Sequence, residues 1–284
     1  MIARVSLLTV LVLAVAASAS PATTDEHIKT ETVTYRDGQT ALAGYLAYDA
    51  TADEPRPLVL VVHEWWGLND YARSRARQLA SLGYVAFAVD MYGDGVVAET
   101  AQQARELSAP FRSDRELMRR RVRAGLTAVC DHPRVDGDRV GAIGYCFGGT
   151  VVLELARSGA DVNAVVSFHG GLSTPDADDA KDIRASVLVC SGADDRSVPM
   201  SQVAAFVEEM RAGGVDYQVV LYGGAVHAFT NPDSGDDPSD NVAYNAAADR
   251  RSWQLMRYFL GRTLETPKPD EGACRNAVNE GSSE

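Results

Sequence analysis

The run from Arg139 to Ala156 constrains the fold of this chain more than any other segment. Two apolar stretches flank Gly144-Tyr-Cys-Phe-Gly-Gly149. This order predicts a buried strand, a tight glycine turn and a helix, the arrangement called a nucleophile elbow. Cys146 would stand at the tip of the turn, at a helix N-terminus where the helix dipole favours a thiolate. A buried structural cysteine beside a glycine-rich turn is the alternative interpretation of this motif alone.

The remainder of the chain alternates between strand and helix patterns. A continuous apolar run over 58–63 is typical of a strand buried on both faces of a parallel sheet. Further strands are expected at 84–89, 164–168, 186–190 and 217–222, and helices near 69–82, 98–109, 115–130, 201–212 and 242–260. Because strands alternate with helices, we expect an α/β fold with a mostly parallel sheet and helices on both faces. Strand patterns on either side of Asp37-Gly38 predict an N-terminal antiparallel hairpin.

Length and composition fit a single domain. The chain has 284 residues, of which 46% are apolar and 23% charged, and no linker interrupts its middle. We place the domain at 31–262, after a polar spacer at 20–30 and before a tail at 263–284 that we expect to be disordered. A net charge of −12 argues against binding to nucleic acid or to anionic membrane surfaces.

The first 19 residues have the pattern of a secretory signal peptide. Arg4 precedes an apolar stretch over 5–17, and Ala17-Ser-Ala19 matches a cleavage site. The apolar stretch is shorter than the ~20 residues that a membrane-spanning helix needs. We therefore expect an exported protein, periplasmic or secreted, without a stable membrane anchor.

The four cysteines show no spacing typical of a zinc site or a disulfide framework. Cys190 ends an apolar strand and Cys130 closes a helix, so we expect both to pack in the core. Cys274 lies in the polar tail and is a candidate free thiol. A bridge between Cys130 and Cys274 is conceivable, but no sequence feature supports it.

A cysteine nucleophile needs a base, and the base needs a carboxylate to orient it. In folds built around an elbow, the acid and then the histidine follow the nucleophile at successive strand ends. His227 is the only histidine after residue 169, so it is the expected base. Asp194 and Asp195 both follow the preceding strand, and spacing alone does not separate them. A surface histidine and a turn with two aspartates are the alternatives, but three suitable groups in the right order outweigh them.

Five stretches together resemble the dienelactone hydrolase family over roughly residues 32–262. They are His63-Glu-Trp-Trp-Gly-Leu68, Ala88-Val-Asp-Met-Tyr-Gly93, Gly144-Tyr-Cys-Phe-Gly-Gly149, Gly192-Ala-Asp-Asp195 and His227-Ala-Phe-Thr-Asn-Pro232. The resemblance implies an α/β-hydrolase fold and cleavage of a carboxylic ester or lactone through an S-acyl enzyme, without a metal or cofactor. In the family the acid is the last residue of a Gly-small-x-Asp pattern, and this selects Asp195.

The resemblance also implies roles for residues around the elbow. In the family, a glutamate at the place of Glu64 hydrogen-bonds the resting thiol and takes its proton when substrate enters. Burial would raise the pKa of Glu64 toward that of a useful base, and a structural carboxylate that caps the loop is the alternative. The oxyanion hole would consist of the backbone N–H groups of Phe147 and Trp65. We expect His63 and His169 to support the site rather than react.

The residues that would recognise the substrate are less determined. Trp65, Trp66 and Tyr145 are candidates for apolar pocket walls. Dienelactone-specific members of the family carry an arginine where this chain has Asn231, which we expect to contact the substrate. Arg105 and Arg112 lie only in the broad region of the family's second arginine. Carboxylate recognition is usually the work of arginine. We therefore expect neutral esters or lactones to be turned over at least as well as dienelactone.

Three other functions are alternatives to this interpretation. One is a thioesterase or general small-ester hydrolase, and another is a catalytically silent binding protein on the same scaffold. A thiol-redox protein is disfavoured because no second cysteine lies near Cys146. The expected partner is a small ester or lactone, and we expect a monomer.

Overall fold

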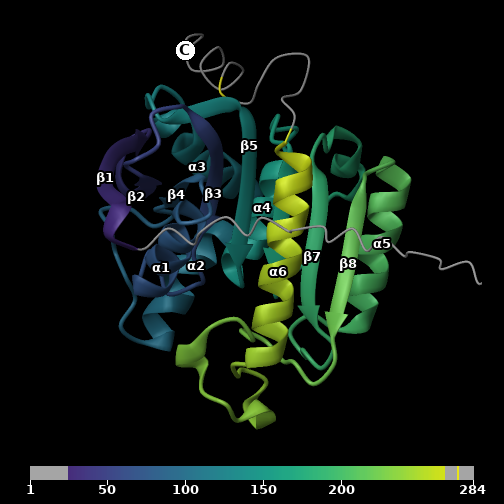
Figure 1. Cartoon of the computed structure of the whole chain (residues 1–284). Coiled ribbons are helices and arrows are strands. Elements are labelled where there is room, and N and C mark those ends of the chain that lie inside the picture. Colours follow the sequence, from purple (N-terminus) through teal and green to yellow (C-terminus); the bar gives the residue numbers. More distant parts are fainter. Residues whose placement is uncertain (1–24, 266–273, 275–284) are drawn as a thin grey trace, which may run out of the picture.

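Eight strands form one sheet in the order β1-β2-β4-β3-β5-β6-β7-β8 (Figure 1). This computed structural model describes residues 25–265 and Cys274. The strands are β1 (Ile28–Asp37), β2 (Thr40–Asp49), β3 (Arg56–Val62), β4 (Val85–Val89), β5 (Val135–Tyr145), β6 (Ala164–Phe168), β7 (Ser186–Gly192) and β8 (Tyr217–Tyr222). The β1–β2 and β2–β4 pairs are antiparallel, and all other pairs are parallel. The predicted α/β class, the N-terminal hairpin and the mostly parallel sheet are confirmed.

Helices cover both faces of the sheet. On one face α1 (Asp70–Ala80) and α6 (Ala246–Thr263) enclose an apolar core, and α6 crosses the near side of the sheet in Figure 1. On the other face α3 (Arg115–Cys130), α4 (Phe147–Arg157) and α5 (Met200–Gly213) enclose a second core. The helix α2 (Ala101–Ser113) packs against α3. The central strands are buried on both sides, which explains their uninterrupted apolar sequence. No helix in the described part of the chain has both the length and the apolar character needed to cross a membrane.

The ends of the domain differ from the boundaries expected from sequence. The strand β1 begins at Ile28, inside the segment 20–30 that we expected to be a spacer. The final helix begins at residue 246 rather than 242, because the Asn245 side chain caps it by accepting the N–H of Ala248. The expected tail, 263–284, begins with Thr263, which is the last residue of α6, and its second residue, Leu264, is buried in the core. The predicted leader at 1–19 lies outside the described residues.

A disulfide joins the expected tail to the domain, so of the two alternatives for Cys274, a free thiol or a bridge to Cys130, the structure shows the bridge. Cys130, at the end of α3, is bonded to Cys274 across a sequence separation of 144 residues. Cys274 is buried against Gly137. A Cβ atom added at Gly137 would lie 2.6 Å from the Cβ atom of Cys274, so the two residues are in close contact. Cys146 and Cys190 are not in disulfides. The bridge therefore ties Cys274 to the end of α3, and the cysteine packs against Gly137 near the start of β5.

We expect the double variant Cys130→Ser/Cys274→Ser to lose about 2–5 kcal/mol of stability, because the bridge closes a long loop in the unfolded chain. Urea unfolding with and without a dithiol reductant measures the loss. The reductant should destabilise the wild type and leave the double variant unchanged, since Cys146 and Cys190 are already thiols. Equal unfolding midpoints of the wild type with and without reductant would contradict the prediction.

Candidate active site

The candidate site lies at the carboxyl ends of the parallel strands, where open α/β sheets commonly bind their ligands. Glu64 follows β3, Cys146 follows β5, and Asp195 and His227 come after β7 and β8. A cavity of about 910 Å³ opens at this edge and is lined by Glu64, Cys146 and His227 among other residues. Parallel strands thus bring together side chains that are far apart in the sequence.

Cys146 occupies a strained turn between β5 and α4. Its backbone has φ 52° and ψ −113°, a conformation that residues with a side chain rarely adopt. A Cβ atom at Gly144 would lie 2.0 Å from the carbonyl oxygen of Gly148, and one at Gly148 would lie 2.2 Å from that of Val62. Glycine is therefore required at both positions for α4 to approach the sheet, as the elbow pattern predicts.

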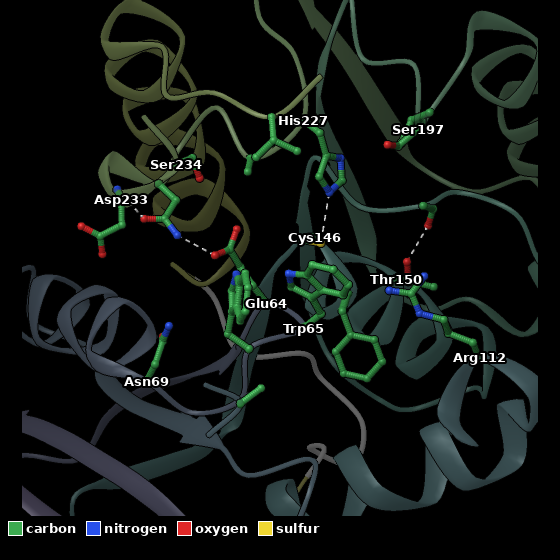
Figure 2. Close-up of a pocket in the computed structure, with 18 of the residues that line it drawn as sticks. Glu64, Trp65, Asn69, Arg112, Cys146, Thr150, Ser197, His227, Asp233 and Ser234 are labelled. Carbon is green, nitrogen blue, oxygen red and sulfur yellow. Dashed lines mark hydrogen bonds between the residues drawn. The ribbon is translucent and has the colours of Figure 1, made fainter. Parts of the chain in front are cut away.

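The three groups expected to form a triad are in hydrogen-bond contact. His227 Nε2 lies 3.1 Å from Cys146 Sγ (Figure 2), and His227 Nδ1 lies 2.8 Å from Asp195 Oδ2. The other oxygen of Asp195 accepts the backbone N–H of Ser197 at 2.8 Å. Asp194 instead accepts the N–H of Gly224 at 3.0 Å, so it is a turn residue. The geometry separates the two aspartates in the way that the family resemblance implies.

Charge within this contact chain favours the protonated form of His227. Burial lowers the pKa of His227, but a negative charge on Cys146 and the hydrogen bond to Asp195 together raise that pKa well above its ordinary value. Burial raises the pKa of Asp195, but the hydrogen bond and charge of His227, together with the hydrogen bonds from Ser197 and Asn241, outweigh it, so the net shift is downward. Asp195 and His227 therefore each stabilise the charged form of the other.

Glu64 lies in the cavity wall but pairs with a different partner than expected. Asn231 Nδ2 donates to Glu64 Oε2 at 2.6 Å, the dashed line from Glu64 in Figure 2. Within the described part of the chain, the hydrogen bond of the Cys146 thiol goes to His227 and none joins it to Glu64. Asn231, which we expected to bind substrate, is 5% exposed and has its amide group directed at Glu64.

Burial raises the pKa of Glu64 to about 7, from 4.5, and the Asn231 hydrogen bond opposes the shift only in part. Folded Glu64 thus keeps its proton to higher pH than the unfolded chain does, so its contribution to stability falls as pH rises from 4.5 to about 7. At ~1.4 kcal/mol per pKa unit, the loss reaches about 3 kcal/mol.

We therefore expect Glu64→Gln to be more stable than the wild type at pH 8 by up to about 3 kcal/mol, with the difference vanishing near pH 4. Chemical denaturation across this pH range measures it. Glu99→Gln, at an exposed residue of the same cavity, is the matched control and should show no such trend. A constant difference between wild type and Glu64→Gln at all pH values would contradict the prediction.

The two expected oxyanion donors lie in the cavity wall. Phe147 is the first residue of α4, and Trp65 follows Glu64. In the described residues, neither backbone N–H has a hydrogen-bond partner. Two unpaired N–H groups in residues of the cavity wall agree with the expected oxyanion role, which stays a prediction.

Of the three expected apolar wall residues, the structure supports two. Trp65 and Trp66 line the cavity, with their rings against each other. Tyr145 does not line it: the side chain is fully buried below the site and stacks on Phe168 with ring centroids 4.8 Å apart. Tyr145 is the last residue of β5, and its side chain points into the core under α1 and α6. The expectation for Tyr145 was wrong because the elbow turns the chain between this residue and Cys146.

Sequence reasoning missed several residues of the site. Arg115, at the start of α3, lines the cavity together with Arg112, whereas Arg105 does not. Neither Arg112 nor Arg115 pairs with a carboxylate in the part of the chain that the structure describes. In Figure 2, Arg112 and Glu64 lie on opposite sides of Cys146. Nothing in the local sequence distinguishes these arginines from other charged helix residues.

Asn241 was also missed. It holds the loops of the acid and the base together: its side chain accepts the N–H of Arg196 at 2.7 Å and donates to Ser197 Oγ at 2.9 Å. Its backbone carbonyl accepts the N–H of His227 at 3.1 Å. The backbone of Asn241 has a left-handed φ of 67°, which asparagine adopts more readily than most residues. No sequence pattern predicts the contacts between its side chain and the loop of Asp195.

The chain is similar to known proteins in both sequence and fold. The model of the dienelactone hydrolase family matches residues 42–264. A protein of Synechocystis, provisionally named a carboxymethylenebutenolidase, is 29% identical over 84% of this chain and 98% of its own length. A crystal structure of a dienelactone-hydrolase-like promiscuous phosphotriesterase from metagenomic libraries is 44% identical, covers 84% of this chain and 99% of its own, and has a TM-score of 0.81. A Klebsiella pneumoniae structure, provisionally assigned as a dienelactone hydrolase, is 25% identical over 83% of this chain and 99% of its own, with a TM-score of 0.71.

Proposed function

The chain belongs to the dienelactone hydrolase family, and on this premise we propose that it cleaves a carboxylic ester or lactone through Cys146, His227 and Asp195. Membership of the family makes the chain a dienelactone-hydrolase-like hydrolase. What we propose is the catalytic triad and the class of substrate. One observation carries it: the contacts of 3.1 Å and 2.8 Å that link sulfur, imidazole and carboxylate at the wall of a cavity. A nucleophile, its base and the group that orients the base are the parts that acyl transfer requires.

In the first half of the reaction, Cys146 Sγ attacks the carbonyl carbon of the ester or lactone. The carbonyl oxygen becomes an oxyanion, and the N–H groups of Phe147 and Trp65 donate hydrogen bonds to it. The C–O bond then breaks, and the His227 imidazolium gives its Nε2 proton to the departing alkoxide. An S-acyl enzyme and an alcohol result, and in a lactone the two remain joined.

In the second half, neutral His227 takes a proton from water, and the resulting hydroxide attacks the S-acyl carbon. The same two N–H groups stabilise the second oxyanion. The thiolate leaves, the carboxylic acid is released, and the imidazolium again pairs with the thiolate. Asp195 remains ionised throughout and holds His227 in the tautomer that points Nε2 at sulfur.

A panel of purified substrates tests the proposal: short aryl esters, unsubstituted lactones, dienelactone and acyl thioesters. Turnover of an oxygen ester or lactone with accumulation of an acyl group on Cys146, observed by mass spectrometry, is the expected result. Faster turnover of thioesters would favour a thioesterase. Binding without turnover of any of them would favour a silent binding protein and end the proposal.

The charge preference of the substrate stays a prediction. Asn231 supplies no positive charge and is occupied by Glu64, which supports turnover of neutral esters and lactones. Arg112 and Arg115 at the cavity wall are the groups that an anionic substrate would meet instead. Measuring kcat/KM for a neutral lactone and for dienelactone at low and high salt distinguishes a preference for neutral substrates from a preference for anionic ones. If the arginines bind the substrate carboxylate, kcat/KM for dienelactone should fall as salt screens them, and the value for the neutral lactone should not.

A second candidate function is hydrolysis of phosphotriesters. The specific observation is the 44% identity to a structure described as a promiscuous phosphotriesterase. A neutral aryl phosphotriester assayed with wild type and Cys146→Ala tests it. Release of the aryl alcohol that depends on Cys146 supports the activity, and release that survives in Cys146→Ala argues against it at this site.

We also propose that the protein is exported. The predicted signal peptide supports export, and so does the Cys130–Cys274 disulfide, because such bonds persist mainly in oxidising compartments. N-terminal sequencing of the mature protein is the test. A sequence that begins at Ser20 is expected, and retention of Met1 in the purified protein would oppose export.

A further inference from the structure

His169 is a buried histidine that the proposed reaction does not use. It follows β6, has a left-handed φ of 41°, and is fully buried. Its Nδ1 accepts the backbone N–H of Cys146 at 3.1 Å, beside the carbonyl oxygen of Phe168, which accepts the same N–H at 3.0 Å. The strained backbone of the nucleophile is therefore held by one main-chain and one side-chain acceptor.

The other ring nitrogen of His169 reaches the loop of the base. Because Nδ1 must accept from Cys146, the proton of the neutral ring is on Nε2, which donates to Thr230 Oγ1 at 2.7 Å. Thr230 follows His227 by three residues. One side chain thus connects the backbone of the nucleophile to the loop that carries the base.

Thr230 is itself anchored on its far side. Its hydroxyl is 2.7 Å from the hydroxyl of Tyr71, and its carbonyl accepts Arg75 Nη2 at 2.8 Å. The same Nη2 is paired with Asp249 at 2.7 Å. These helix residues of α1 and α6 are mostly buried, so Thr230 has little freedom to shift.

The sheet order explains why such a connection is needed. The nucleophile follows β5 and the base follows β8, with β6 and β7 between them. Neighbouring strands are ~4.8 Å apart, so β5 and β8 are on the order of 14 Å apart. The Cys146–His227 contact of 3.1 Å therefore depends on how the loop after β8 returns across the sheet edge. His169, at the end of the intervening β6, bonds to both sides of that gap.

We propose that His169 is a positioning residue that, through Thr230, sets the distance between the Cys146 nucleophile and the His227 base. The proposal rests on the proposed roles of Cys146 and His227. His169 takes no proton in the reaction and touches no substrate; it acts through the backbone of Cys146 and the loop of His227.

The surroundings of His169 keep it neutral, as this role requires. Burial and then the positive charges of His227 and Arg75 hold its pKa well below the ordinary value. Its ring packs edge-on against the rings of His227 and Phe229, with centroids 5.4 Å and 5.2 Å away. A proton on Nδ1 would remove the acceptor of the Cys146 N–H, so only the neutral ring serves both bonds.

Thr230→Val and Thr230→Ser form a matched pair that tests the connection. Valine has the shape of threonine but leaves His169 Nε2–H without an acceptor, whereas serine keeps the hydroxyl. The readouts are kcat, KM and the pH profile of the alkylation rate of Cys146 by iodoacetamide. Alkylation reports Cys146, because Cys190 is fully buried and Cys130 and Cys274 are bonded to each other.

For Thr230→Val we expect kcat to fall about 10- to 100-fold with KM within about twofold, as a small misplacement of reacting groups produces. The alkylation profile should shift to higher pH, because a thiolate farther from the His227 imidazolium is less stabilised. Thr230→Ser should remain within about threefold of wild type in kcat. His169→Asn, in which a short side chain tolerates the left-handed backbone but does not reach Thr230, should repeat the valine result.

Wild-type kcat and alkylation profiles in folded Thr230→Val and His169→Asn would overturn the proposal. So would a loss of stability without change in either readout, which is the signature of a structural role alone. If wild type fails to turn over any ester while its alkylation profile still responds to Thr230→Val, the positioning role stands and the proposed function falls.

Discussion

Cys146→Ala is expected to abolish hydrolysis of esters and lactones while the protein stays folded. Alanine removes only the sulfur at the tip of the elbow, so the turn and α4 keep their packing. Loss of a covalent nucleophile costs on the order of 10⁶-fold in kcat in a comparable triad enzyme. Initial rates with a chromogenic ester and an unfolding curve for each protein measure the two quantities.

The control for this variant is Ser173→Ala, which changes a hydroxyl in the wall of the same cavity and should keep most of the activity. Ser167 and Ser191 are not alternative nucleophiles by position, since both are buried away from the cavity. Iodoacetamide should label Cys146 before any other cysteine. Ester turnover at the wild-type rate in Cys146→Ala would reject the proposed mechanism.

The second large effect is expected for Asp195→Asn. The carboxylate accepts from His227 Nδ1 and thereby leaves Nε2 facing sulfur. An asparagine amide can donate to Nδ1 and so favours the wrong tautomer, and a comparable change elsewhere lowers kcat about 10⁴-fold. Asp194→Asn is the matched control, because Asp194 bonds the backbone of Gly224 and not the imidazole. It should change kcat by less than about tenfold.

Steady-state kinetics on the two variants decides between the aspartates. A larger loss for Asp194→Asn than for Asp195→Asn would mean that the working enzyme uses a different carboxylate from the one in contact with His227. NMR of the His227 ring in wild type and Asp195→Asn would report directly which ring nitrogens carry protons. The expected change is loss of the Nδ1 proton, which leaves the neutral ring of the variant protonated on Nε2.

Much of this architecture follows from local sequence. Apolar runs of strand length, helix caps and the glycine turn at Cys146 depend on neighbours within a few residues, so they can be read without the fold. The candidate base follows by elimination, because His227 is the only histidine after residue 169. The family resemblance added the choice of Asp195 and the role expected for Glu64.

Other features depended on where strands end and how loops return. Tyr145 and Cys146 are adjacent in sequence, yet one side chain enters the core and the other faces the cavity. The partner of Glu64 is Asn231, a residue 167 positions away. The Cys130–Cys274 bridge also joins segments that are far apart in the sequence, and the spacing of the cysteines does not predict it.

The sequence by itself therefore determined the fold class, the elbow and the candidate nucleophile and base, because those depend on periodicity and on local steric rules. Only the tertiary structure decided which side chains complete the site: Asn241 between the acid and base loops, Arg115 in the cavity wall, and His169 between Cys146 and Thr230. Such contacts form only when the order of the strands and the paths of the loops place the side chains to within about an ångström. The packing of the whole domain sets these positions, so no single segment of the sequence predicts them.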